Sequence, residues 1–258
     1  MKHMLWAQKR YRQMLGGRDS FTLAGARPAT YRAGQSLAFY RKQPENAAPH
    51  YLAELLRHHK VNRFTCPYLF VIVVMNPRDG FPGGGGRPIN GGINIGGGIV
   101  ILSSRDLDRN KNFQSTLQHE LGHGFGLPHV NVYGRDMRKS PSIMSYNPTH
   151  HTRGFQPSRS PGKLSPENIR GLAMNRRAFA KLTFDPAKDV PNGYKMPRRI
   201  VWLGPMKIPG QLAYRIKATT SAGEVYGSSV QCAVLGQIKP SRGPGIPYDP
   251  RSMWHSGP

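Results

Sequence analysis

The chain is organised around the stretch His119-Glu120-Leu121-Gly122-His123-Gly124-Phe125-Gly126-Leu127-Pro128-His129. His119 and His123 are four residues apart, so on a helix their imidazoles lie on one face, one turn apart. Gly126 can adopt a positive φ, end the helix and turn the chain back. Pro128 then prevents the helix from resuming. The returning chain brings His129 toward the first two histidines, so the spacing predicts three imidazoles that meet at one point.

Three imidazoles in this arrangement are typical of a zinc site, with each nitrogen about 2.0–2.1 Å from the metal ion. Three protein ligands leave the fourth position of a tetrahedral ion open, which is the arrangement of catalytic rather than structural sites. Glu120 points about 100° around the helix from His119. It can therefore reach a water on the metal without binding the metal, and we expect it to act as a general base. The predicted cofactor is one catalytic Zn²⁺ ion held by His119, His123 and His129.

A second stretch, Ser142-Ile143-Met144-Ser145-Tyr146, follows the third histidine after a short polar loop. Together with the histidine motif, it resembles the metzincin metallopeptidases, whose zinc motif is followed by a turn containing methionine. The Ser-Ile-Met-Ser-Tyr form is most similar to the astacin and serralysin branches, although the subfamily stays unassigned. The resemblance implies that Met144 and Gly126 support the site. It also implies that Tyr146 lies beside the zinc, where its hydroxyl can stabilise an oxyanion.

This resemblance implies a zinc-dependent endopeptidase that hydrolyses peptide bonds of a protein or peptide substrate. A zinc-bound water would attack the carbonyl carbon, with Glu120 as the general base and Tyr146 as a second catalytic residue. The alternative is a basic polyanion-binding protein whose zinc site is structural or vestigial. The intact Glu120 argues against this alternative, because a structural site does not need a base.

The fold implied by the resemblance is an α/β (α+β) catalytic domain with a mixed twisted sheet and a zinc-binding helix. Apolar periodicity predicts helices over 4–15, 46–61, 112–126 and from Ser165 to about 179. It predicts strands over 21–24, 37–40, 68–75 (the central buried strand) and 99–102. In such folds the strand before the zinc helix pairs with extended substrate at the sheet edge. This role is expected for Ile99, Val100, Ile101 and Leu102.

The domain organisation predicted from these patterns has four parts. Residues 1–185 form the catalytic domain, and residues 186–193 form a linker. Residues 194–239 form a small β-rich module, and the tail over 240–258 is rich in Pro and Gly and expected to be disordered. The glycine-rich segment 79–98 reads either as a flexible surface loop or as a mobile rim of the cleft. The first helix begins within a few residues of Met1, so we expect the first strand of the domain to be missing.

Composition limits the possible partners. The net charge is +24, from 37 Lys and Arg against 13 Asp and Glu, and such a surface attracts polyanions. The basic residues are dispersed, however, and no dedicated nucleic-acid motif is present. No run of 18 apolar residues exists, so no membrane span is expected. The resemblance implies secretion, although no signal peptide is present. Cys66 and Cys232 could pair or could be buried free thiols, and the oligomeric state is left open.

Overall fold

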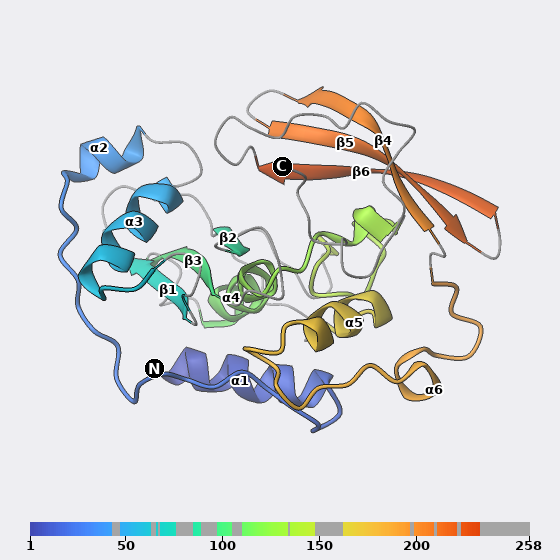
Figure 1. The fold of residues 1–258 in the computed structure, drawn as a ribbon, viewed down its shortest axis with the longest axis horizontal. Helices are drawn as coiled ribbons and strands as arrows, with labels where there is room; N and C mark the ends of the chain where they lie inside the picture. Colours follow the sequence, from blue (N-terminus) through green and yellow to red (C-terminus); the bar gives the residue numbers. More distant parts are fainter. Residues whose placement is uncertain are drawn as a thin grey trace.

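The computed structural model describes residues 1–42, 47–62, 66, 68–75, 85–88, 97–104, 110–133, 135–147, 162–196, 199–208, 211–220 and 223–232. Helix α4 (Asn110–Gly124) lies in the middle of the molecule (Figure 1). Helix α1 (Lys2–Met14) packs along it, and a small mixed sheet packs on another side. None of the described helices is long and apolar enough to cross a membrane.

The mixed sheet has strand order β1-β3-β2, with β3 (Gly98–Ser103) in the middle. Strand β1 (Leu69–Val74) pairs with it in parallel, and β2 (Gly85–Pro88) pairs with it antiparallel. The predicted edge position of Ile99, Val100, Ile101 and Leu102 is therefore wrong, because this strand has a neighbour on each side. The expectation that 68–75 is the central strand is also wrong. Among the described residues β1 pairs only with β3, and all six of its residues are only partly buried.

The central strand separates two hydrophobic cores. Val100 and Leu102 face the core that α1 and α4 fill, whereas Ile99 and Ile101 face the core that contains Tyr51. Successive side chains of a strand point to opposite faces, so an apolar strand of this kind requires cover on both sides. Helix α3 (Ala48–His58) supplies cover on the second side, together with α2 (Leu37–Arg41). The sheet thus lies between two helical layers.

The helices predicted before residue 130 are confirmed, whereas the two short strands predicted at 21–24 and 37–40 are not found. Helices α1, α3 and α4 lie within two residues of the predicted spans at most ends. Residues 37–40 form helix α2 instead of a strand, because Ser36 caps the helix by accepting a hydrogen bond from Phe39 N at 3.2 Å. Residues 21–24 form no strand. The side chain of Phe21 packs into the main core, so an apolar residue there reflects burial and not strand pairing.

Helix α5 (Pro166–Met174) begins where the sequence predicts, and Ser165 and Asn168 form a reciprocal capping box at its start. It ends at Met174, earlier than predicted, and residues 176–178 form a turn. A short helix α6 (Pro186–Asp189) lies at the predicted linker. The last described elements are β4 (Arg199–Ile208), β5 (Gln211–Thr220) and β6 (Gly223–Cys232), which pair antiparallel in chain order. They fall within the predicted β-rich module, and the tail 240–258 lies outside the described residues.

Strand β2 approaches α4 closely at Gly86. A Cβ atom placed there would lie 2.1 Å from the carbonyl oxygen of Glu120 and 3.1 Å from Cβ of His123. Because one of these atoms belongs to the helix backbone, no side-chain movement can relieve the overlap. Strand β2 can lie on α4 only because residue 86 has no side chain.

We expect Gly86→Ala to push β2 away from α4 and to lower the free energy of unfolding by about 1–3 kcal/mol. Chemical denaturation measures this change. Gly25→Ala is the matched control, because its added Cβ would have no neighbour closer than 3.8 Å and should leave the free energy of unfolding nearly unchanged. Equal stability of the two variants would show that β2 does not rest on the helix.

Candidate metal centre

The stretch that carries the three predicted ligands begins on α4 and leaves it through a turn at Gly126. Gly126 has φ 97°, as the sequence predicts. Its N–H donates to the carbonyl of His123 at 2.9 Å, and the N–H of Leu127 donates to the carbonyl of Gly122 at 2.8 Å. These two bonds define a Schellman turn, which ends the helix and reverses the chain. The reversal places His129 opposite the face of α4 that carries the other two histidines.

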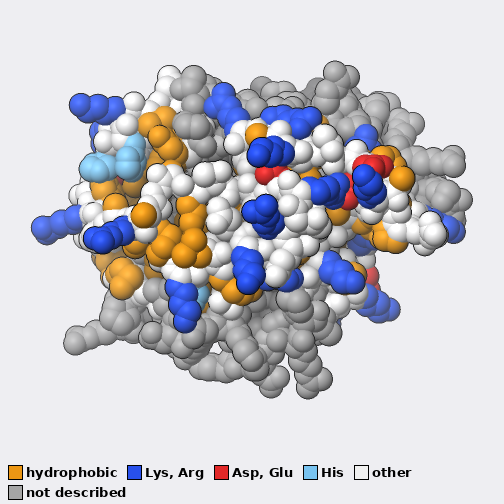
Figure 2. All heavy atoms as spheres, turned by 90° about the horizontal axis from the view of Figure 1, so that it is seen from below, with side chains coloured by type: hydrophobic (Ala, Val, Ile, Leu, Met, Phe, Trp, Pro, Cys, Tyr) orange, Lys and Arg blue, Asp and Glu red, His pale blue; other side chains and the backbone are white. Residues whose placement is uncertain are grey.

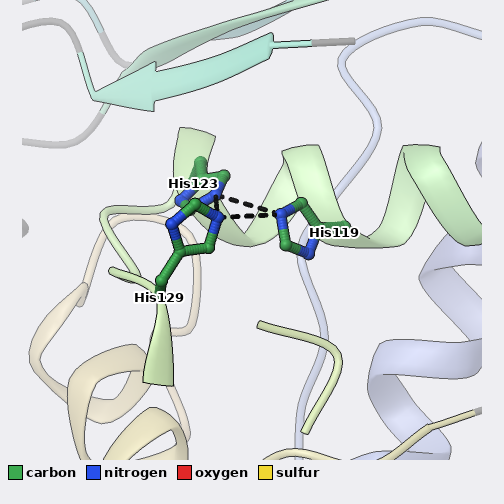
Figure 3. A group of neighbouring side chains, drawn as sticks. All are labelled: His119, His123 and His129. Carbon is green, nitrogen blue, oxygen red and sulfur yellow. Dashed lines mark hydrogen bonds between the residues drawn. The ribbon is translucent and has the colours of Figure 1, made fainter. Parts of the chain in front are cut away.

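The three predicted ligands come together at one point. Nε2 of His119 lies 3.2 Å from Nε2 of His123 and 3.2 Å from Nε2 of His129. Nε2 of His123 lies 3.0 Å from Nε2 of His129. Figure 3 shows the rings of His119 and His123 extending from α4 and the ring of His129 meeting them from the returning chain. Among the described residues this is the one group of histidine, cysteine and acidic side chains arranged to hold a metal ion.

The protonation of two of these rings follows from their other nitrogen atoms. Nδ1 of His119 lies 2.6 Å from the carbonyl oxygen of Ile143, and Nδ1 of His123 lies 2.7 Å from that of Leu127. A carbonyl oxygen only accepts hydrogen bonds, so both Nδ1 atoms carry the proton. In the neutral rings both Nε2 atoms then present lone pairs. Lone pairs that face each other at about 3 Å repel unless a cation or a proton lies between them.

The dimensions of this triangle fit a tetrahedral zinc ion. With metal–nitrogen bonds of about 2.0–2.1 Å, adjacent ligand nitrogens of a tetrahedron are about 3.3 Å apart. The observed separations of 3.0–3.2 Å need only small adjustments to reach this value. The Nδ1 bonds to Ile143 and Leu127 are the outer contacts that hold ligating imidazoles in orientation. The residues present therefore suit zinc, and one side of the ion would stay open.

Glu120 lies next to this cluster on α4 and is 8% exposed. Burial raises the pKa of its carboxyl to about 8, and a hydrogen bond from the backbone N–H of Gly86 opposes this rise. Burial also lowers the pKa of His123 to about 4, which favours the neutral ring that binds metal. Without a nearby cation, Glu120 is therefore mostly protonated at pH 7. A divalent cation among the three histidines would favour its carboxylate form.

Met144 and Gly122 meet beneath the helix. Met144 is fully buried, and a Cβ atom on Gly122 would lie 2.3 Å from its Sδ atom. Two hydrogen bonds anchor the methionine turn over residues 142–146. Val130 N donates to the carbonyl of Met144 at 3.0 Å, and Ser142 Oγ donates to Asn168 Oδ1 of α5 at 2.7 Å. This turn also supplies the Ile143 carbonyl that orients His119.

Tyr146 lies beside two of the three ligands. Its ring stacks on that of His119, with centroids 5.5 Å apart and an interplanar angle of 28°. Its centroid lies 5.0 Å from that of His129, with the planes at 55°. Its backbone N–H donates to the carbonyl of Met137 at 2.8 Å, which fixes the chain at this position. The structure thus brings Tyr146, Met144, Gly126 and the three histidines into one site, together with Glu120.

Two features of the site could not be predicted from the sequence. One is the close packing at Gly122 and Gly86, and the other is the pair of carbonyl groups that bond Nδ1 of His119 and His123. Gly122 occupies a variable position of the motif, yet a larger residue there would require the buried Met144 side chain to move. Gly86 lies in a glycine-rich segment where no single glycine stands out. The carbonyls of Ile143 and Leu127 carry no side-chain signal at all. His150 and His151, which follow the methionine turn in sequence, lie outside the described residues.

The raised pKa of Glu120 predicts a pH dependence of stability in metal-free protein. Folded protein holds the Glu120 proton up to about pH 8, whereas the unfolded chain loses it near pH 4.5. Between pH 6.5 and 8 the folded state therefore binds more protons, and the free energy of unfolding should fall by about 1–2 kcal/mol as pH rises. The lowered pKa of His123 changes stability chiefly between about pH 4 and 6.5, its folded and unfolded pKa values, and so below this window.

Denaturant titrations in the presence of a chelator measure this fall. Glu120→Gln should remove it, because the amide has no proton to lose. Glu54→Gln is the control and should retain the fall, since the pKa of the Glu54 carboxyl is lowered and this group stays ionised throughout the window. A fall of equal size in Glu120→Gln would assign it to another group.

Comparisons with known proteins leave the family open. No protein-family model matches the chain, no curated protein matches it, and no solved structure matches it. The function proposed below therefore depends on the chemistry of the site and on the resemblance carried by residues 119–146.

Proposed function

We propose that this protein is a zinc-dependent endopeptidase of the metzincin type. The observation that carries the proposal is the triangle of Nε2 atoms, in which two carbonyl acceptors direct the lone pairs of His119 and His123 toward His129. Such an arrangement suits a cation with one open coordination position. The neighbouring Glu120 and Tyr146 supply the acid–base and hydrogen-bonding groups that hydrolysis requires.

Zinc bound by the three histidines would activate a water molecule and polarise the carbonyl of the substrate. Glu120 accepts a proton from the attacking water and delivers it to the leaving amine nitrogen. Its low exposure keeps competing solvent away from this proton. Tyr146 lies beside His119 and His129, where its hydroxyl can donate a hydrogen bond to the oxyanion that develops on the substrate. The peptide nitrogen departs as an amine.

In this proposal, strand β2 positions the peptide substrate. It pairs with β3 on one side, and among the described residues no strand pairs with its other side. Gly86 of this strand bonds the Glu120 carboxyl, so its backbone lies next to the reacting groups. An extended peptide that adds to β2 would bring its scissile bond toward Glu120 by backbone hydrogen bonds. The segment 79–98, predicted as loop or cleft rim, includes this strand.

The proposal is tested by metal analysis and by casein hydrolysis with and without a chelator. We expect one equivalent of zinc and cleavage that the chelator abolishes and added zinc restores. The alternative, a binding protein with a structural zinc ion, gives one equivalent of zinc without cleavage. That result would overturn the proposal, because an open position beside Glu120 would then serve no reaction.

Glu120→Ala should retain zinc and the fold but lose activity by about 10²–10⁴-fold, because loss of a general base has a cost of this size. Activity on a fluorogenic peptide, metal content and circular dichroism are measured together. Glu54→Ala serves as a control for loss of a carboxylate elsewhere and should keep its catalytic rate. Loss of zinc from Glu120→Ala would mean that Glu120 holds the metal rather than acting as the base.

Tyr146→Phe should lower kcat by about 10²-fold and leave KM nearly unchanged, because a donor that bonds only the developing oxyanion acts in the transition state. Phenylalanine keeps the ring that packs on His119, so the variant separates the hydroxyl from the ring. Steady-state kinetics on one peptide, with zinc content determined, measures the effect. A kcat within about threefold of the unsubstituted protein would reduce Tyr146 to a packing role.

A further inference from the structure

A hollow of about 560 Å³ opens beside α1, between the segment of residues 18–22 and the segment of residues 177–181. Its walls carry five cationic side chains and one carboxylate, from Lys9, Arg12, Arg18, Arg177, Lys181 and Asp19. Figure 2, which views the molecule from the side of α1, shows Lys and Arg side chains gathered over the middle of this face. None of the residues that line the hollow belongs to the metal centre.

The single carboxylate in the hollow is already engaged. Oδ1 of Asp19 accepts the N–H of Ser20 at 2.8 Å, and Oδ2 accepts the N–H of Lys181 at 2.8 Å. Asp19 thus joins the segments 18–22 and 177–181, which form the walls. The Arg18 guanidinium forms a salt bridge with Asp189, whose side chain is buried.

Three cations of the hollow are exposed and form no ion pair with an acidic side chain among the described residues. These are Lys9, Arg12 and Lys181. Like charges gathered around one hollow repel each other, which raises the free energy of the protein until an anion enters. The hollow therefore suits an anionic ligand, and three side chains can bind it without breaking an existing ion pair.

The walls of the hollow are held by hydrogen bonds between the elements that form them. Nε2 of Gln8 donates to the carbonyl of Phe21 at 2.8 Å, and Oγ of Ser20 donates to the carbonyl of Gln8 at 2.8 Å. These two bonds attach the segment of residues 18–22 to α1. The backbone positions that carry the cations of α1 and of residue 181 are consequently set before any ligand binds, so only the side chains need to be ordered on binding.

We propose that this hollow binds a sulfated polysaccharide. Its exposed groups are ammonium, guanidinium and amide or hydroxyl side chains, which bind sulfate groups and sugar hydroxyls. Single-stranded nucleic acid requires aromatic side chains on which its bases stack. Phe21 is the one aromatic residue of the hollow, and it is buried against Tyr11 and Phe125 in the main core. The hollow therefore offers charge and hydrogen bonds without a stacking surface, and this inference does not depend on the proposed hydrolysis.

The test uses the full chain, a heparin octasaccharide as the probe, and calorimetric titration at several NaCl concentrations. The variant Lys9→Gln/Arg12→Gln/Lys181→Gln should weaken binding at least tenfold at 0.15 M NaCl. It should also lower the slope of log Kd against log salt concentration by about 2–3, since three counterion-releasing contacts are lost. Thermal unfolding of the variant confirms that it folds.

The matched control is Arg32→Gln/Lys42→Gln/Lys139→Gln, which removes the same charge from exposed positions outside the hollow. It should change Kd less than threefold. Equal weakening by the two triple variants would overturn the proposal, because binding would then follow net charge alone. A thymidine oligonucleotide of matched charge gives the second measurement. If it binds as tightly as the octasaccharide and loses affinity equally in the first variant, the hollow is a nucleic-acid site and the proposal is wrong.

Discussion

The structure depends on one constraint, the mutual approach of three imidazole nitrogens, of which those of His119 and His123 present lone pairs. The carbonyls of Ile143 and Leu127 hold two of the rings with their Nε2 atoms turned inward. Each carbonyl belongs to a turn, one at the methionine segment and one at the end of α4. The orientation of the ligands is therefore set by backbone, and the two turns must be in place before the three nitrogens can meet.

Two glycines allow strand β2 and the methionine turn to contact α4 closely from two sides. Strand β2 contacts the helix at Gly86, and Met144 contacts it at Gly122. Tyr11 of α1 supports the same helix through a hydrogen bond from its hydroxyl to the carbonyl of Gln118 at 2.8 Å. The helix that carries His119 and His123 is thus held by a strand, a turn and a second helix. Close packing of this kind leaves few ways for the ligands to move.

The sequence predicts the site better than the sheet for a physical reason. Positions 119–129 are local, so helical spacing and one positive-φ glycine suffice to bring the three histidines together. Strand order depends on pairing between distant segments, and the apolar run 99–102 indicates burial on both faces without indicating which strands flank it. The helix at 37–41 was missed because a serine cap outweighed a short apolar run. Gly86 and Gly122 could not be singled out, because their importance comes from contacts with residues far along the chain.

The site is an unfavourable part of an otherwise well-packed fold. In metal-free protein it combines inward lone pairs with a buried carboxyl whose pKa is about 8. Both features cost free energy, and one divalent cation would relieve both, because it would bond the nitrogens and stabilise the carboxylate of Glu120. The cores on the two sides of β3 supply the stability that tolerates this cost. A polar cluster that served only the fold would gain nothing from directing two acceptors at each other, so this arrangement supports the proposal that these residues bind a cation.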